Sequence, residues 1–311
     1  MYRQRYKLSF CIPTYNRVNF IIKGLRYLSN IPLISKVEVL VFDDGSTDAT
    51  KREINLLLKS NTKLNLNYFK FKKHQGFDKV VSVIVKKAKG EFCWLISDDD
   101  LPREDSIKKI LSIIDKKPNL SLIHVNYSRF DNVLQKVTSE KMVGSINKDI
   151  YFNNTDDFLF KNIFNSYFNF LGTNVITMST DIVNQKKWIK ASIGMKRFYG
   201  HNFIHCFIIA KMIKEDSRIY YVAEPIVQYL SNNHRIWPND IWKDYNNIFL
   251  EYLKEIGYPK DKIKLVREAQ IKYEKREGVM KHPLLKYVYK FISPIYAKIQ
   301  YLKSKYGGRI K

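Results

Sequence analysis

Short apolar runs alternate along the first 125 residues with segments in which apolar positions recur every three or four residues. The runs predict buried strands and the periodic segments predict amphipathic helices. The predicted strands are Leu8–Ile12, Val37–Phe42, Leu66–Phe71, Glu91–Ile96 and Leu120–Val125; the predicted helices are Val18–Ser29, a segment ending near Lys59, Phe77–Lys89 and Pro102–Lys116. Strands separated by helices of this length are typical of βαβ crossovers, so we expect an α/β fold with a mostly parallel sheet and flanking helices.

This alternation weakens after about residue 126. The pattern there predicts a loop or short hairpin over 126–149, a strand over Gly172–Ser179, a helix over Phe198–Lys214, a strand over Arg218–Ala223 and mostly helix from about Asn232 onward. We therefore expect one α/β domain over 1–230, with halves at 1–125 and 126–230. A helical, basic and aromatic C-terminal region would follow over 231–311.

Polar residues follow three of the predicted strands at their carboxyl ends. The first strand leads into Pro13–Arg17, the second into Asp43–Asp44 and the fourth into Asp98–Asp100. Ligands of an open parallel sheet bind beyond this edge, so the three segments are expected to meet there.

Three consecutive carboxylates, Asp98 to Asp100, repel one another unless a cation neutralises them, and their hard oxygen atoms suit Mg²⁺ or Mn²⁺. The alternative is a solvated turn in which Asp99 or Asp100 caps the next helix.

Asp43 suits a different task. Its carboxylate can accept a hydrogen bond from a nucleobase N–H, and Tyr15 can pack against a base or ribose. The alternative is that residues 43–48 form only a tight turn plus a helix cap, which Gly45, Ser46 and Asp48 alone would explain. Gly45 would supply the turn, and Ser46 or Thr47 could cap the following helix. We expect both: Gly45 to Asp48 shape the turn, while Asp43 faces the ligand.

The net charge of +24 favours anionic partners, which include nucleic acid, an anionic membrane surface and phosphorylated substrates. No helix-turn-helix, finger or RNP-type signature supports nucleic acid, and clustered aspartates would repel its phosphates without a metal. A Walker-type phosphate loop is also absent from the sequence, so phosphates would be held by the metal and by nearby cations. Cys11, Cys93 and Cys206 are far apart and predict buried thiols in a reducing compartment, so we expect a cytoplasmic protein.

The segments Ser9–Arg17, Val41–Asp48 and Asp98–Asp100 together resemble the family 2 glycosyltransferases of the GT-A fold. The opening segment resembles the branch that contains abequosyltransferase-like O-antigen enzymes. The resemblance covers roughly residues 7–125. It implies that 1–125 is the nucleotide-sugar half of the domain and that 126–230 is the acceptor half.

The resemblance further implies an inverting, metal-dependent transfer from a nucleoside-diphosphate sugar, with uridine as the preferred base. It implies metal binding by Asp98 and Asp100 and donor binding by Pro13, Tyr15, Arg17, Asp43, Lys73, Lys79, Asp98 and Asp99. Lys73 and Lys79 are the residues expected to approach the diphosphate, because relatives carry a basic residue and a glycine near this position.

A general base must deprotonate the acceptor hydroxyl. Relatives carry a carboxylate ahead of a late helix, and the comparable stretch here, Phe198–Cys206, has none. His201 is the first candidate and His205 the second, four residues on and on the same predicted helical face. Asp156 and Asp157 are further options, and both histidines also fit a purely structural role.

The C-terminal segment 281–311 contains eight Lys or Arg residues and no acidic residue, interspersed with aromatic and aliphatic side chains. This composition favours a helix in an anionic membrane interface, kinked at Pro294; the alternative is a solvated helix packed on the domain. We expect a peripheral enzyme on the inner face of the cell membrane that acts on a lipid-linked or cell-surface glycan in polysaccharide biosynthesis. A nucleotidyltransferase, a non-catalytic homologue and a basic nucleic-acid-binding protein remain alternatives.

Overall fold

A computed structural model describes residues 6–60, 63–131, 135–142, 146–163, 177–231, 241–268 and 271. Its strands are β1 (Tyr6–Thr14), β2 (Glu38–Asp43), β3 (Asn65–Lys70), β4 (Gly90–Leu95), β5 (Leu101–Pro102), β6 (Leu122–Asp131), β7 (Lys136–Ser139), β8 (Ile150–Phe152), β9 (Asp181–Asn184) and β10 (Ile219–Ser231). Its α-helices are α1 (Val18–Leu28), α2 (Thr50–Lys59), α3 (Phe77–Lys87), α4 (Ser106–Lys116), α6 (Gln185–Ala191), α7 (Ile204–Glu215) and α8 (Ile241–Glu255), and η2 (Asp157–Ile163) is a π-helix.

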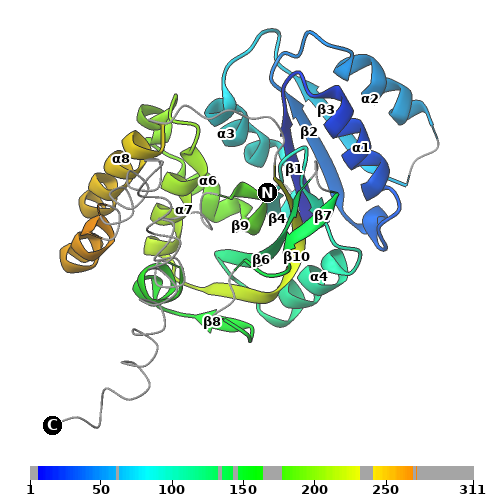
Figure 1. Cartoon of the computed structure of the whole chain (residues 1–311). Helices are drawn as coiled ribbons and strands as arrows, with labels where there is room; N and C mark the ends of the chain where they lie inside the picture. The colour runs from blue at the N-terminus through cyan, green and yellow to red at the C-terminus, as the bar shows by residue number, and fades with distance from the viewer. Residues whose placement is uncertain are drawn as a thin grey trace, which may run out of the picture.

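One mixed sheet runs through the centre of the molecule in the order β3-β2-β1-β4-β9-β6-β10-β5 (Figure 1). The strands β3, β2, β1 and β4 are parallel neighbours, and so are β6 and β10. β9 lies antiparallel between β4 and β6, so those two strands point the same way. The predicted α/β fold with a mostly parallel sheet is confirmed.

Helices cover both faces of the sheet (Figure 1). On one face α1, α2 and α4 bury an apolar cluster against inward residues such as Phe10 and Trp94. On the other face α3, α6, α7 and α8 pack over residues such as Cys11 and Leu95. Neighbouring residues of one strand serve opposite faces because successive side chains alternate. Cys11, Cys93 and Cys206 are buried free thiols, as predicted.

Two predictions near the acidic segments are wrong. The helix expected from Pro102 begins instead at Ser106, because Leu101–Pro102 pairs with β10 and the Arg103 N–H bonds the Ile226 carbonyl. Neither Ser46 nor Thr47 caps the second helix. It begins at Thr50, whose N–H donates to Asp48 Oδ1 at 3.0 Å.

The second half departs further from its pattern. The predicted hairpin within 126–149 is confirmed by the antiparallel β6–β7 pair. The strand predicted at 218–223 extends to Ser231, passing an irregularity at Pro225. Residues 172–176 of the strand predicted over 172–179 lie outside the described residues. Its remainder is wrong, because Met178–Thr180 forms a 3₁₀ turn and β9 follows.

The helix predicted from Phe198 begins at Ile204. The residues before it cannot continue a helix, because Gly200 and Asn202 both adopt positive φ, 98° and 61°. His201 therefore lies in a loop while His205 lies in the first turn of α7, so the expectation that both share a helical face is wrong.

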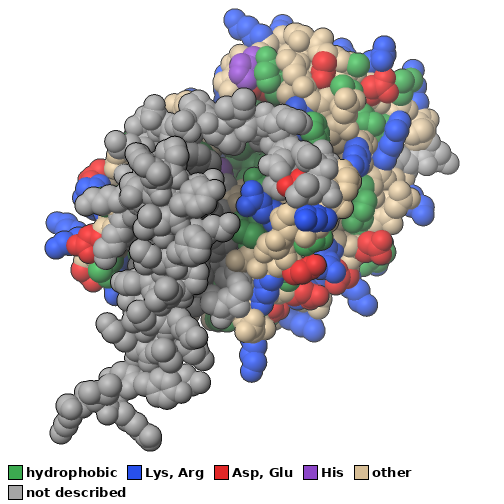
Figure 2. Space-filling model, viewed as in Figure 1, with side chains coloured by type: hydrophobic (Ala, Val, Ile, Leu, Met, Phe, Trp, Pro, Cys, Tyr) green, Lys and Arg blue, Asp and Glu red, His purple; other side chains and the backbone are tan. Residues whose placement is uncertain are grey.

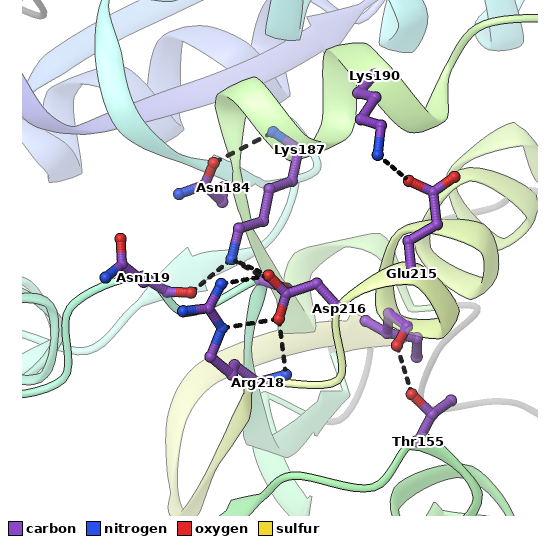
Figure 3. A network of polar contacts seen from close by, with 10 residues as sticks. Asn119, Thr155, Asn184, Lys187, Lys190, Glu215, Asp216 and Arg218 are labelled. Atoms are coloured by element: carbon purple, nitrogen blue, oxygen red, sulfur yellow. Dashed lines mark hydrogen bonds and ion pairs between the residues drawn. The ribbon is translucent and has the colours of Figure 1, made fainter.

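Ionic contacts tie the second half together at the amino edge of β6 and β10 (Figure 3). The carboxylate of Asp216 accepts two hydrogen bonds from the Arg218 guanidinium. Its Oδ2 also forms an ion pair with Lys187 Nζ at 2.9 Å. Lys187 also donates to the Asn119 carbonyl, and its own N–H is capped by Asn184. The network joins the segments before β6 and β10 to helix α6.

In the described C-terminal part, residues 249–266 contribute to the core on α7. The basic segment 281–311 lies outside the described residues, and none of the described helices has the length and apolarity to span a membrane. On the face in Figure 2, Lys and Arg side chains stand among Asp, Glu and uncharged residues. The charge on this face is therefore spread over several elements.

Candidate functional site

The carboxyl ends of β1, β2 and β4 meet at one edge of the sheet, as predicted. Thr14 pairs with Asp43 in the parallel register of β1 and β2, and the Ile96 N–H beyond β4 bonds the Cys11 carbonyl of β1. The Thr14 hydroxyl then donates to Asp98 Oδ2 at 2.8 Å. Three sequence segments up to 84 residues apart are thus joined by direct contacts.

The acidic triplet Asp98–Asp100 is buried, with exposed fractions of 3%, 7% and 6%. Arg17 Nε lies 3.0 Å from Asp98 Oδ1, and Arg17 Nη2 bonds Asp99 Oδ2. Such burial excludes the alternative of a solvated turn. The helix-capping alternative is also wrong, since α4 follows Asp105 without a side-chain cap.

Hydroxyl and amide donors also contact the triplet. The Ser97 hydroxyl donates to Asp99 Oδ1, and the Ser179 hydroxyl donates to Asp100 Oδ2 at 2.5 Å. The Leu230 N–H donates to Asp100 Oδ1 at 3.0 Å. Ser179 and Leu230 come from the second half of the chain, and no motif in the sequence pointed to either.

Asp43 is fully buried and holds the turn that follows β2. It accepts hydrogen bonds from the Ser46 N–H at 2.6 Å and from the Tyr68 hydroxyl at 2.5 Å. Burial and this hydrogen bond raise the pKa of Tyr68. Gly45 adopts a φ of 82°, and a Cβ there would lie 2.6 Å from the Lys73 carbonyl carbon, so the predicted need for glycine is confirmed.

Asp44 fixes the loop before α3. Its Oδ1 accepts the Gln75 N–H at 2.8 Å, and its Oδ2 accepts the Gly76 N–H at 2.9 Å and lies 2.8 Å from His74 Nδ1. The His74 ring stacks on Tyr15 with centroids 4.2 Å apart. Tyr15 is 38% exposed, so this pair presents aromatic surface at the site edge.

The remaining predicted donor residues lie close by along the same segments. Pro13 is buried in β1, in register with Phe42. Lys79 donates to Gln75 Oε1 at 2.6 Å and lies over the Phe71 ring. Lys73 is exposed in the loop that carries His74.

Asp78 is a residue that the sequence reasoning missed. It is 3% exposed and accepts N–H groups from Gly200 at 2.7 Å, Asn202 at 2.9 Å and Ile204 at 3.0 Å. It thereby ties the start of α3 to the loop that contains His201. An acidic residue in a helix's first turn, two positions after a glycine, was the available signal.

The candidate bases differ in their surroundings. His201 is partly exposed in the loop held by Asp78. His205 is buried, with its ring edge-on to Phe77 at 6.1 Å. Asp156 and Asp157 follow β8, which pairs with the first residues of β10, so they lie toward the amino edge, away from the triplet.

The triplet fits a divalent ion by its donor chemistry. Its three adjacent carboxylates offer hard oxygen atoms, and Arg17 pairs with Asp98 and Asp99. Among the described residues no group of three or more His, Cys, Asp or Glu side chains forms a preformed metal cage. Mg²⁺ commonly uses one or two protein carboxylates and completes its shell with substrate phosphates and water.

Comparisons with known proteins agree with this geometry. The family model "Glycosyl transferase family 2" matches residues 9–190, more than half of the chain. Abequosyltransferase RfbV of Salmonella typhimurium is 24% identical over 71% of this chain. An uncharacterized glycosyltransferase of Mycoplasma genitalium is 36% identical over 35% of it. The matches span 65% and 36% of those relatives' own lengths, less than two thirds in both cases.

Solved structures share the fold. TarS of S. aureus in complex with UDP-GlcNAc superposes with a TM-score of 0.62 at 17% identity, covering 84% of this chain and 70% of TarS. The mannosyltransferase PcManGT from Pyrobaculum calidifontis, in complex with GDP-Man and Mn²⁺, has a TM-score of 0.52 at 15% identity and covers 86% and 69%. The sheet is therefore that of GT-A enzymes, and the chain belongs to glycosyl transferase family 2.

Proposed function

We propose that this protein is an inverting glycosyltransferase that moves a sugar from a nucleoside-diphosphate sugar, preferably a UDP-sugar, to a hydroxyl of a lipid-linked or cell-surface glycan. One observation carries the proposal: three neighbouring parallel strands deliver Arg17, Asp43 and the buried acidic triplet to one sheet edge. Membership of family 2 and the fold shared with a UDP-GlcNAc complex support it.

Asp98 and Asp100 would hold Mg²⁺ or Mn²⁺, which supplies positive charge for the departing nucleoside diphosphate. The chain's own part is to hold these carboxylates in place. Thr14 orients Asp98, while Ser179 and the Leu230 N–H orient Asp100. Fixed donors of this kind keep the site preorganised, so little reorganisation accompanies donor binding.

The nucleoside would lie on the exposed Tyr15 ring, beside Pro13 and the turn anchored by Asp43. Aromatic stacking with a base contributes about 1–3 kcal/mol in nucleic-acid sites. Lys73 and Lys79, on the loop and helix that follow β3, would approach the diphosphate.

His201 would take the proton of the acceptor hydroxyl. Its loop position leaves it partly exposed, whereas His205 is enclosed by the core of α7 and α3. The expected result for His201→Gln is a loss of transfer of roughly 10²–10⁴-fold, with donor affinity unchanged in calorimetry. Wild-type transfer in this variant would remove His201 as the base.

Donor binding provides the test of the proposed function. Isothermal titration of the full chain with UDP, GDP, CDP and dTDP, each with and without Mn²⁺, should show a Mn²⁺-dependent preference for one nucleotide. Asp100→Asn should weaken that binding at least tenfold, whereas Asp216→Asn, an equal charge change at the amino edge, should leave it unchanged. A nucleotide affinity that is the same with and without Mn²⁺, and the same in Asp100→Asn as in the wild type, would refute the proposal.

We also propose that the basic segment 281–311 holds the protein on an anionic membrane surface on the cytoplasmic side, near a polyprenyl-phosphate-linked acceptor. Each Lys or Arg near such a surface contributes about 1 kcal/mol. The full chain should therefore sediment with phosphatidylglycerol vesicles and remain in solution with neutral ones. Equal sedimentation of a chain ending at residue 280 would exclude this role.

A further inference from the structure

Arg17 forms ion pairs with Asp98 and Asp99 of the acidic triplet. It comes from the loop between β1 and α1, and its side chain is 14% exposed, against 0% for the side chain of Asp98 and 3% for that of Asp99. The guanidinium lies over the Phe20 ring at 4.2 Å. Carboxylates on its edge and an aromatic ring on its face thus fix its position.

The two carboxylate oxygens that Arg17 contacts are Asp98 Oδ1 and Asp99 Oδ2. A divalent ion that binds Asp98 must share this carboxylate with the guanidinium. Two cations held by one buried carboxylate repel each other more strongly than in water, because the surroundings screen them poorly. Arg17 and the metal therefore oppose each other at Asp98.

We propose that Arg17 is an internal counter-ion that lowers the affinity of the triplet for a divalent cation until the nucleotide is bound. The inference rests on the proposed function, in which Asp98 and Asp100 take the metal. The diphosphate of the donor brings negative charge to the same site. It offers the guanidinium an alternative partner with good geometry for its fork of N–H donors.

The consequence is a coupling between two ligands. With Arg17 present, nucleotide and metal each favour binding of the other, and by linkage the effect is reciprocal. A ligand-free enzyme then keeps its carboxylates paired, while the donor and the metal enter together. A purely orienting Arg17 would act in the opposite sense, because its loss would disorder the carboxylates and weaken metal binding.

Mn²⁺ binding measured by electron paramagnetic resonance separates these roles without any turnover. The full-length wild type is titrated with Mn²⁺, with and without UDP, after correction for the Mn²⁺–UDP complex in solution. Arg17→Gln should bind Mn²⁺ at least tenfold more tightly than the wild type when UDP is absent. The tightening of Mn²⁺ binding by UDP should be at least tenfold smaller in the variant.

Arg52→Gln is the matched control, because it removes the same charge from a side chain that is 74% exposed in α2. It should bind Mn²⁺ as the wild type does. Arg17→Lys keeps the positive charge and should keep the weak Mn²⁺ affinity of the ligand-free wild type. Equal or weaker Mn²⁺ binding by Arg17→Gln would overturn the inference.

Should Arg17→Gln not fold, the wild type alone decides, because Mn²⁺ affinity that does not rise with UDP contradicts the coupling. The failure of the proposed function looks different. In that case Asp98→Asn would bind Mn²⁺ and UDP together as well as the wild type. If Mn²⁺ affinity falls in Asp98→Asn but is the same in Arg17→Gln as in the wild type, only the role of Arg17 is overturned.

Discussion

The two edges of the central sheet use the same ions in opposite proportions. At the amino edge Arg218 and Lys187 both pair with the single carboxylate of Asp216 (Figure 3). At the carboxyl edge Arg17 pairs with two members of a buried acidic triplet. In these contacts two cations share one carboxylate at the amino edge, whereas two carboxylates share one guanidinium at the carboxyl edge.

The difference separates a structural network from a binding site. Asp216 joins segments that must stay together, and its cations make several contacts each. Burying three adjacent carboxylates beside one arginine opposes folding, because like charges repel and lose hydration. A ligand that brings positive charge would relieve this cost, and for that reason we propose the carboxyl edge as the functional one.

The largest expected effect tests this separation directly. Asp98→Asn should lower sugar transfer by about a thousandfold, because it removes a carboxylate from the proposed metal site. Its stability should equal or exceed that of the wild type. The Thr14 hydroxyl can reverse its role and accept from the new amide, and one repulsive charge is gone. Steady-state kinetics and urea unfolding measure the two quantities, and a variant that transfers sugar normally would contradict the assignment.

The second-largest expected effect is a loss of stability on substitution of Gly45, in the turn that follows β2. Gly45→Ala combines a φ of 82° with a Cβ that would lie 2.6 Å from backbone of Lys73. Strain and overlap together should destabilise the protein by about 3 kcal/mol. Gly194→Ala, at the same φ but in open space, should destabilise it by only about 1 kcal/mol. Equal losses in urea unfolding would show that the turn can shift away from Lys73.

The smallest expected effect is a pH-dependent loss of stability on substitution of Asp216, at the amino edge. The hydrogen bonds from Arg218 hold the pKa of Asp216 below its usual range. A lowered pKa means that the unfolded chain takes up the proton first as pH falls, so the ionised Asp216 stabilises the protein above about pH 4 and loses this effect below. Asp216→Asn should therefore be less stable than the wild type by about 1 kcal/mol at pH 7. The difference should shrink as the pH falls below about 4 and be lost only as it falls through the lowered pKa of the folded Asp216, with transfer activity near normal at pH 7. A stability difference that does not change with pH would reject the ionic explanation.

The first half of the chain could be predicted well because its elements are local and strongly patterned. Strand runs such as Leu8–Ile12 and the turn at Gly45 depend on neighbouring residues alone, and the parallel order then brings Asp43 and Asp98 to one edge. The helix start at Ser106 was mispredicted because Leu101–Pro102 pairs with Val227 and Gln228, far along the chain.

The structure of the second half of the chain depends more heavily on contacts between residues far apart in the sequence. The start of α7 is set by Asp78, which accepts the N–H groups of residues more than 120 positions away. Ser179 and the Leu230 N–H reach Asp100 in the same way. Nothing in the local sequence around Ser179 or Leu230 carries that information, so this part of the site emerges only from the fold.

The donor diphosphate could bind at either edge of the sheet. The cations of Lys187 and Arg218 could attract it at the amino edge, and the metal on the acidic triplet could attract it at the carboxyl edge. A crystal structure of the full chain with UDP and Mn²⁺ decides between them. We predict anomalous signal from Mn²⁺ between the diphosphate and the carboxylates of Asp98 and Asp100, with the uracil against Tyr15. A diphosphate bound by Lys187 and Arg218, with no Mn²⁺ at the triplet, would contradict the account.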